Sequence, residues 1–163
     1  MIVNLSPEEV AMAASVAVHR GLEAIINNRQ NNHGLKGNAW TENIEGYCSE
    51  LVVAKALGVY YSAGHGKGFK GADVADNVQV RWASQDSYRL IVRPADQTND
   101  VYVLVTGIAP TFTIKGFMPG ALAKQDRYLD NPGNDRPDAW WVPQSDLFVI
   151  TDLIEYYKTK RGA

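Results

Sequence analysis

The chain has 163 residues, of which 45% are hydrophobic and 21% are charged, and its formal net charge is −2. This length and composition predict one globular domain with a substantial core, spanning residues 1–163. The near-neutral charge excludes a global basic field, so any contact with nucleic acid would need a local basic patch.

A single cysteine and the absence of long apolar runs indicate the cellular compartment of the protein. Cys48 excludes an internal disulfide and is interpreted as a small core residue in a reducing compartment. No apolar run approaches the length of a transmembrane span, and the first residues lack the basic and apolar segments of a signal peptide. We therefore expect a cytoplasmic protein with no membrane partner.

Two helices are predicted in the first third of the chain. The first covers residues 6–28, because Ser6 can cap it and Glu9 completes a capping box. A polar loop follows, and a second helix is predicted over residues 41–57, with its first residue as the cap and Gly58 as the stop.

Glu50 lies on an unusual face of the second predicted helix. Helical spacing places it in one stripe with Gly46, Val53 and Leu57, which are small or apolar, so its carboxylate is expected to point inward. A carboxylate in such a place needs a partner. Two alternatives stay open, a metal ion or a core arginine, for which Arg81 is a candidate.

A loop rich in glycine occupies residues 63–71 and contains His65, Lys67 and Lys70. Glycines let backbone approach a ligand closely, and lysines attract phosphate. The pattern is not a P-loop, because Gly-Lys-Ser/Thr is missing. A plain surface loop is the alternative interpretation.

The stretch over residues 71–84 combines an acid with a polar strand face. Asp73 precedes a predicted strand over residues 78–83, in which Gln79 and Arg81 are two residues apart and therefore share a face. An acid, an oxygen ligand and a cation at one point can bind a hard metal and a phosphate. An ordinary strand with a solvated polar face is the alternative.

The remaining elements predict an α+β or α/β fold, with helices covering an antiparallel or mixed sheet. Residues 88–92 are expected to form a hairpin with the strand over residues 78–83. Further expected elements are a β-like run at 59–62, strands at 101–106 and 111–117, a helical turn within 120–127, a surface loop at 130–138, the apolar run Trp140-Trp141-Val142-Pro143, and a helix at 151–160 capped by Thr151-Asp152.

The order of these features resembles the PD-(D/E)xK nuclease superfamily. Glu50 resembles the helical acid of that family, Asp73 its metal-binding aspartate, and Gln79-Val80-Arg81 its Glu-x-Lys tripeptide. The resemblance spans roughly residues 44–148. It implies a restriction-endonuclease-like fold, with a mixed central sheet flanked by helices and a core over residues 41–148.

The resemblance also implies a mechanism. Asp73, Gln79 and the Val80 carbonyl would hold Mg²⁺ or Mn²⁺, with Glu50 bound directly or through water, and the metal would lower the pKa of a water. Two residues depart from the family pattern. Gln79 is a neutral ligand, and Arg81 keeps its charge and cannot act as a base, although it can hold a phosphate.

The function implied by the resemblance is metal-dependent hydrolysis of DNA. The basic residues that would steer the DNA backbone are Lys67, Lys70, Arg89 and Arg93. One alternative is a nuclease-fold module with weak or lost catalysis that binds nucleic acid or a protein partner. Another is an interaction protein anchored by Trp140 and Trp141. A homodimer stays open, as does a phage-encoded protein in the host cytoplasm, because residues 90–147 resemble small phage and bacterial proteins.

Overall fold

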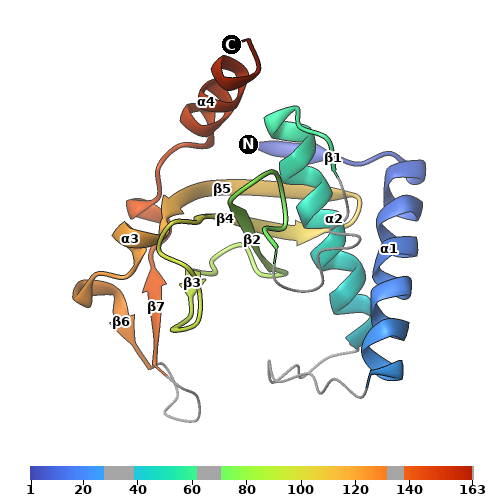
Figure 1. Ribbon diagram of the computed structural model, residues 1–163, viewed down its shortest axis with the longest axis horizontal. Coiled ribbons are helices and arrows are strands. Elements are labelled where there is room, and N and C mark those ends of the chain that lie inside the picture. The colour runs from blue at the N-terminus through green and yellow to red at the C-terminus, as the bar shows by residue number, and fades with distance from the viewer. Residues whose placement is uncertain (28–38, 62–70, 132–137, 163) are drawn as a thin grey trace.

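The computed structural model describes residues 1–27, 39–61, 71–131 and 138–162 (Figure 1). The protein is α+β, as expected, with a mixed sheet, a small antiparallel sheet and four α-helices in these ranges. The elements in chain order are β1 (Ile2–Asn4), α1 (Pro7–Ile26), α2 (Ala39–Leu57), β2 (Val78–Ala83), β3 (Leu90–Val92), β4 (Val101–Ile108), β5 (Thr111–Pro119), α3 (Gly120–Ala123), β6 (Leu129–Asp130), β7 (Ala139–Val142) and α4 (Ile150–Gly162), with 3₁₀ turns at Asp126–Tyr128 and Gln144–Asp146.

The larger sheet has the strand order β1-β5-β4-β2, so β2 forms one of its edges. The β2–β4 pair is parallel, and the other neighbours are antiparallel. The smaller sheet has the order β3-β7-β6 and is antiparallel. In Figure 1, α1 and α2 run side by side, and α2 lies between α1 and the larger sheet.

The two faces of the larger sheet pack against different partners. One core contains Val78 and Val80 of β2 together with Leu57 of α2. The second core contains Tyr102 of β4 and residues of the smaller sheet such as Leu90. Because side chains alternate along a strand, Gln79, between these valines, and Arg81, after Val80, point away from α2 and toward the second core.

The capping box predicted for the N-terminal helix α1 is confirmed. The Ser6 hydroxyl accepts a hydrogen bond from the Glu9 amide, and the Glu9 carboxylate accepts one from the Ser6 amide at 2.7 Å. Cys48 of α2 is buried, and burial raises the pKa of its thiol to about 11, which confirms its interpretation as a core residue. No helix in the described ranges is long and apolar enough to cross a membrane.

Several predicted boundaries and pairings are wrong. The expected hairpin does not form, because β3 pairs with β7, through Leu90 opposite Val142, while β2 pairs with β4. This pairing buries Leu90 and Val142 completely in the second core, which a hairpin with an edge strand would not provide.

The helix starts and the short strands also differ from expectation. The helix α2 begins at Ala39, so Thr41 lies inside it, and α4 begins at Ile150, so Thr151 and Asp152 lie in its first turn. Residues 59–61 form no strand. Strands β1 and β6 were not expected, because runs of three and two residues carry too little pattern to detect.

Candidate functional site

Asp73 lies beside the outer edge of β2, where no other strand of the described residues pairs, and bonds to its backbone. At the start of β2, Val74 and Val78 exchange two backbone hydrogen bonds. The next outward amide of the strand, that of Val80, donates to the Asp73 carboxylate at 2.8 Å instead. The side chain of Asp73 thus continues the hydrogen bonding of the edge strand where the backbone ladder ends.

Glu50 of α2 forms an acid pair with Asp73. Its carboxylate is partly buried and accepts a hydrogen bond from the Tyr61 hydroxyl at 3.0 Å. Burial, and next the negative charge of Asp73, raise the pKa of Glu50 to about 8, although the Tyr61 hydrogen bond and Arg20 oppose the shift. The inward orientation expected for Glu50 is therefore confirmed.

The raised pKa of Glu50 favours its protonated form near neutral pH. Burial also raises the pKa of Asp73, but the Val80 amide and the charges of Arg81 and Arg20 oppose that shift. Asp73 therefore has hydrogen-bonding and positively charged partners that favour its ionised form, whereas burial and the charge of Asp73 favour the protonated form of Glu50.

Arg20 and Tyr47 belong to this site, although the sequence analysis did not single them out. Arg20 of α1 donates a hydrogen bond to the Tyr47 hydroxyl and lies 5.1 Å from the centre of its ring. Its charge opposes the rise in the pKa values of both Glu50 and Asp73. Tyr47 could have been found, because it lies three residues before Glu50 on the same helix. The position of Arg20 depends on how α1 packs on α2.

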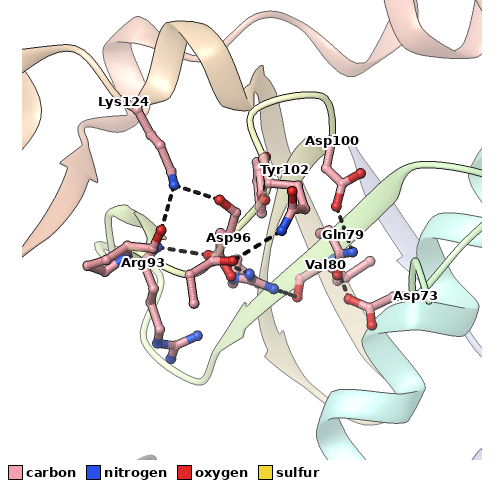
Figure 2. A network of polar contacts seen from close by, with 12 residues as sticks. Asp73, Gln79, Val80, Arg93, Asp96, Asp100, Tyr102 and Lys124 are labelled. Atoms are coloured by element: carbon pink, nitrogen blue, oxygen red, sulfur yellow. Dashed lines mark hydrogen bonds and ion pairs between the residues drawn. The ribbon is translucent and has the colours of Figure 1, made fainter. Parts of the chain in front are cut away.

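Gln79 and Arg81 share a face, as expected, and each bonds to an acid that the sequence pattern did not reveal. The Gln79 amide donates to the Asp100 carboxylate at 2.9 Å (Figure 2). The Arg81 guanidinium donates to the Asp96 carboxylate at 2.8 Å and to the Val80 carbonyl at 3.3 Å. The partner of Arg81 is therefore Asp96, and the alternative that Arg81 pairs with Glu50 is not found.

Both acids belong to residues 93–100, which the structure fixes along nearly their whole length. Six carbonyl groups of this segment accept hydrogen bonds from outside it. The donors are Lys124 to Pro94 and Asp96, Tyr102 to Gln97, Ala121 to Thr98, Asn77 to Asn99, and Gly120 to Asp100. A segment that its composition marks as a polar loop is therefore a fixed part of the site.

Gly120→Ala is expected to lower the free energy of unfolding by about 1–3 kcal/mol, because its added methyl group overpacks the segment at 93–100. A Cβ at Gly120 would lie 2.6 Å from the Gln97 carbonyl oxygen and 3.0 Å from that of Thr98. Urea unfolding measures the change. Gly46→Ala is the control, because a Cβ at Gly46 of α2 meets no atom within 4 Å, and it should stabilise the helix slightly. Equal effects of the two substitutions would contradict the prediction.

The basic residues expected to contact DNA lie in different places. Lys67 and Lys70, with His65 and most of the glycine-rich loop, lie outside the described residues. Arg89 forms an ion pair with Asp130 at 3.4 Å and lies against Trp141 of the smaller sheet. The amide of Arg93 donates to the same Asp96 carboxylate oxygen that accepts from Arg81.

The tryptophans of β7 have packing roles. Trp140 and Trp141 are each partly buried, Trp140 packs on the second core, and the Lys124 ammonium lies 5.0 Å from a Trp140 ring centre. These contacts place both tryptophans in the packing of the smaller sheet.

The oxygen atoms at the edge of β2 fit a hard divalent cation only in part. The carboxylates of Glu50 and Asp73 are ligands that Mg²⁺ and Mn²⁺ accept. The Val80 carbonyl fits poorly, because the positive guanidinium of Arg81 already donates to it. Within the described residues, no three His, Cys, Asp or Glu side chains are close enough to hold a metal ion together. A metal therefore fits best at the Glu50–Asp73 pair.

Comparisons with known proteins found no matching family model, no matching curated protein and no matching solved structure.

Proposed function

We propose that the protein is a metal-dependent nuclease that hydrolyses phosphodiester bonds of DNA, with Glu50 and Asp73 as its metal-binding acids. The observation that carries the proposal is the pairing of these two partly buried carboxylates. Burial first, and the negative charge of Asp73 second, raise the pKa of Glu50 to about 8. An arrangement that opposes ionisation in this way is typical of functional sites, and a divalent cation would relieve the repulsion.

The residues around the acid pair have distinct roles in the proposed reaction. Mg²⁺ or Mn²⁺ at Glu50 and Asp73 would supply a water of lowered pKa and neutralise charge on the scissile phosphate. Arg81 remains charged, so it contributes a positive charge to a phosphate and takes no part in proton transfer. Gln79 bonds to Asp100 and has a supporting role.

A nuclease-fold module with weak or lost catalysis is the second candidate. Two contacts favour it, because Arg81 is already paired with Asp96 and Gln79 with Asp100. A module that binds nucleic acid needs cations but no pair of metal-binding acids, so metal dependence discriminates between the candidates.

The test combines cleavage with metal binding in the unmodified protein. Linear, circular and branched DNA are incubated with Mg²⁺, Mn²⁺, Ca²⁺ or EDTA, and cleavage is expected only with Mg²⁺ or Mn²⁺. Thermal unfolding provides a second measurement, because Mg²⁺ at about 100 times its Kd should stabilise the folded state by about 2.7 kcal/mol. DNA binding without cleavage or metal stabilisation would favour the module. Absence of all three would contradict both candidates.

A further inference from the structure

The side chain of Arg81 is held in place at the edge of β2 by a fixed acid. Its guanidinium donates to the Asp96 carboxylate at 2.8 Å and to the Val80 carbonyl at 3.3 Å, and it lies 5.1 Å from the centre of the Tyr102 ring. The side chains of Arg81 and Asp96 are only 15% and 18% exposed, so solvent screens this ion pair less than it would a surface pair.

Asp96 does not need Arg81 to keep its own position. The carboxylate oxygen that accepts from Arg81 also accepts from the Arg93 amide at 2.8 Å. The Lys124 ammonium donates to the Asp96 carbonyl at 2.6 Å and to that of Pro94 at 2.9 Å, as Figure 2 shows. The segment that carries Asp96 is thus fixed from several sides without the ion pair.

Arg81 is the partner that gains order from the contact. An arginine side chain loses up to about 2 kcal/mol of rotamer entropy when it is fixed, and a bond to a rigid carboxylate offsets this cost before any ligand arrives. The ion pair and the contact with the Tyr102 ring therefore fix where the guanidinium lies before any ligand arrives.

We propose that Asp96 is a positioning residue, which orients the Arg81 guanidinium at the edge of β2 so that it contacts a phosphate of the bound DNA. This inference rests on the proposed function for its substrate. It assigns to Asp96 a role that neither the family resemblance nor the sequence spacing supplies. Asp96 acts through Arg81 and touches no substrate.

The first test follows the Arg81 side chain without DNA. The Nε atom of Arg81 is buried and has no hydrogen-bond partner within the described part of the chain. Its proton should exchange slowly with water and give a sharp NMR signal in the unmodified protein. Asp96→Asn keeps an acceptor for the Arg93 amide but removes the charge, and we expect the Arg81 signal to broaden or disappear. Asp86→Asn is the control, because it removes a different ion pair, that of Asp86 with Lys115. An unchanged Arg81 signal in Asp96→Asn would overturn the proposal.

The second test is a double-mutant cycle between Asp96 and Arg81. Asp96→Asn should lower kcat/KM for DNA cleavage by about 10- to 100-fold, since misplacing a reacting group costs about this much. In an Arg81→Gln background, the same substitution should change kcat/KM by less than about 2-fold. Equal losses in both backgrounds would overturn the proposal and indicate a purely structural role.

If the protein does not cleave DNA, the same double-mutant cycle is measured as DNA affinity in the presence of Ca²⁺. Asp96→Asn should then weaken binding and reduce the salt dependence of the affinity by about one phosphate contact, again only when Arg81 is present. If the protein cleaves no DNA but Asp96→Asn weakens DNA binding only when Arg81 is present, the nuclease function is contradicted and the positioning role stands. If Asp96→Asn has the same effect with and without Arg81, or leaves the Arg81 NMR signal unchanged, the positioning role is contradicted. A protein that does not bind DNA would overturn both.

Discussion

Asp73→Asn is expected to reduce Mg²⁺-dependent DNA cleavage by more than about 100-fold, because loss of residues that merely support a metal ligand already costs about 10- to 100-fold. The substitution should not unfold the protein. An asparagine side chain can still accept the hydrogen bond from the Val80 amide that fixes Asp73, and it removes the negative charge that raises the pKa of Glu50. We therefore expect the free energy of unfolding at about pH 8 to be unchanged or higher, while activity is lost.

The experiment measures cleavage rates and urea unfolding on the same preparations. Asp126→Asn is the matched control, because Asp126 is exposed in a 3₁₀ turn outside the acid pair, and it should alter neither quantity. The metal-dependent rise in melting temperature should also disappear in Asp73→Asn alone. Cleavage that persists unchanged in this variant would contradict the metal-nuclease proposal, whatever the effect on stability.

The features that could be predicted from sequence are those with local causes. The capping box at Ser6 and Glu9 needs only residues three apart. The boundaries of β2 follow from its alternating pattern, and the inward orientation of Glu50 follows from helical spacing. The proximity of Asp73 to the strand also follows, since a few residues separate them in the chain.

The acids that bond Gln79 and Arg81 could not be found in this way, because their position depends on strand pairing. Asp100 directly precedes β4, which runs parallel to β2 with Val101 opposite Val78. Acids that precede one strand lie near polar residues at the start of its parallel neighbour. This proximity can be predicted only when the pairing of the two strands is known. The sequence predicts a hairpin partner for β2, and with that pairing the proximity of Asp100 and Asp96 to Gln79 and Arg81 cannot be predicted.

The edge position of β2 explains why so many polar groups gather there. An edge strand presents unpaired amides and carbonyls that must bond to something other than a neighbouring strand. At Val80 these groups bond to the side chains of Asp73 and Arg81. The same contacts that satisfy the backbone therefore bring an acid and a cation to one residue of the edge strand, within electrostatic reach of each other.

Glu50→Gln is expected to stabilise the protein at alkaline pH by roughly 2–4 kcal/mol. The pKa of Glu50 is about 8 in the folded protein, against about 4.3 in an unfolded chain. The folded state therefore retains a proton that the unfolded state has lost, so the stability of the unmodified protein falls as the pH rises from about 4.3 to about 8. A neutral glutamine does not ionise, and its carbonyl oxygen can still accept from Tyr61.

Urea unfolding at about pH 4, 6 and 9 tests this sign. The two proteins should have similar stability at the lowest pH, and the variant should become the more stable one as the pH rises. The remaining pH dependence of the variant comes in part from Asp73, whose pKa is also raised and whose contribution has the same sign. Glu42→Gln, in the first turn of the same helix, is the matched control and should not reproduce the change. The opposite result at about pH 9, a Glu50→Gln protein less stable than the unmodified one, would place Glu50 in a stabilising ion pair with Arg20. It would also contradict the repulsion between the two acids on which the proposed metal site depends.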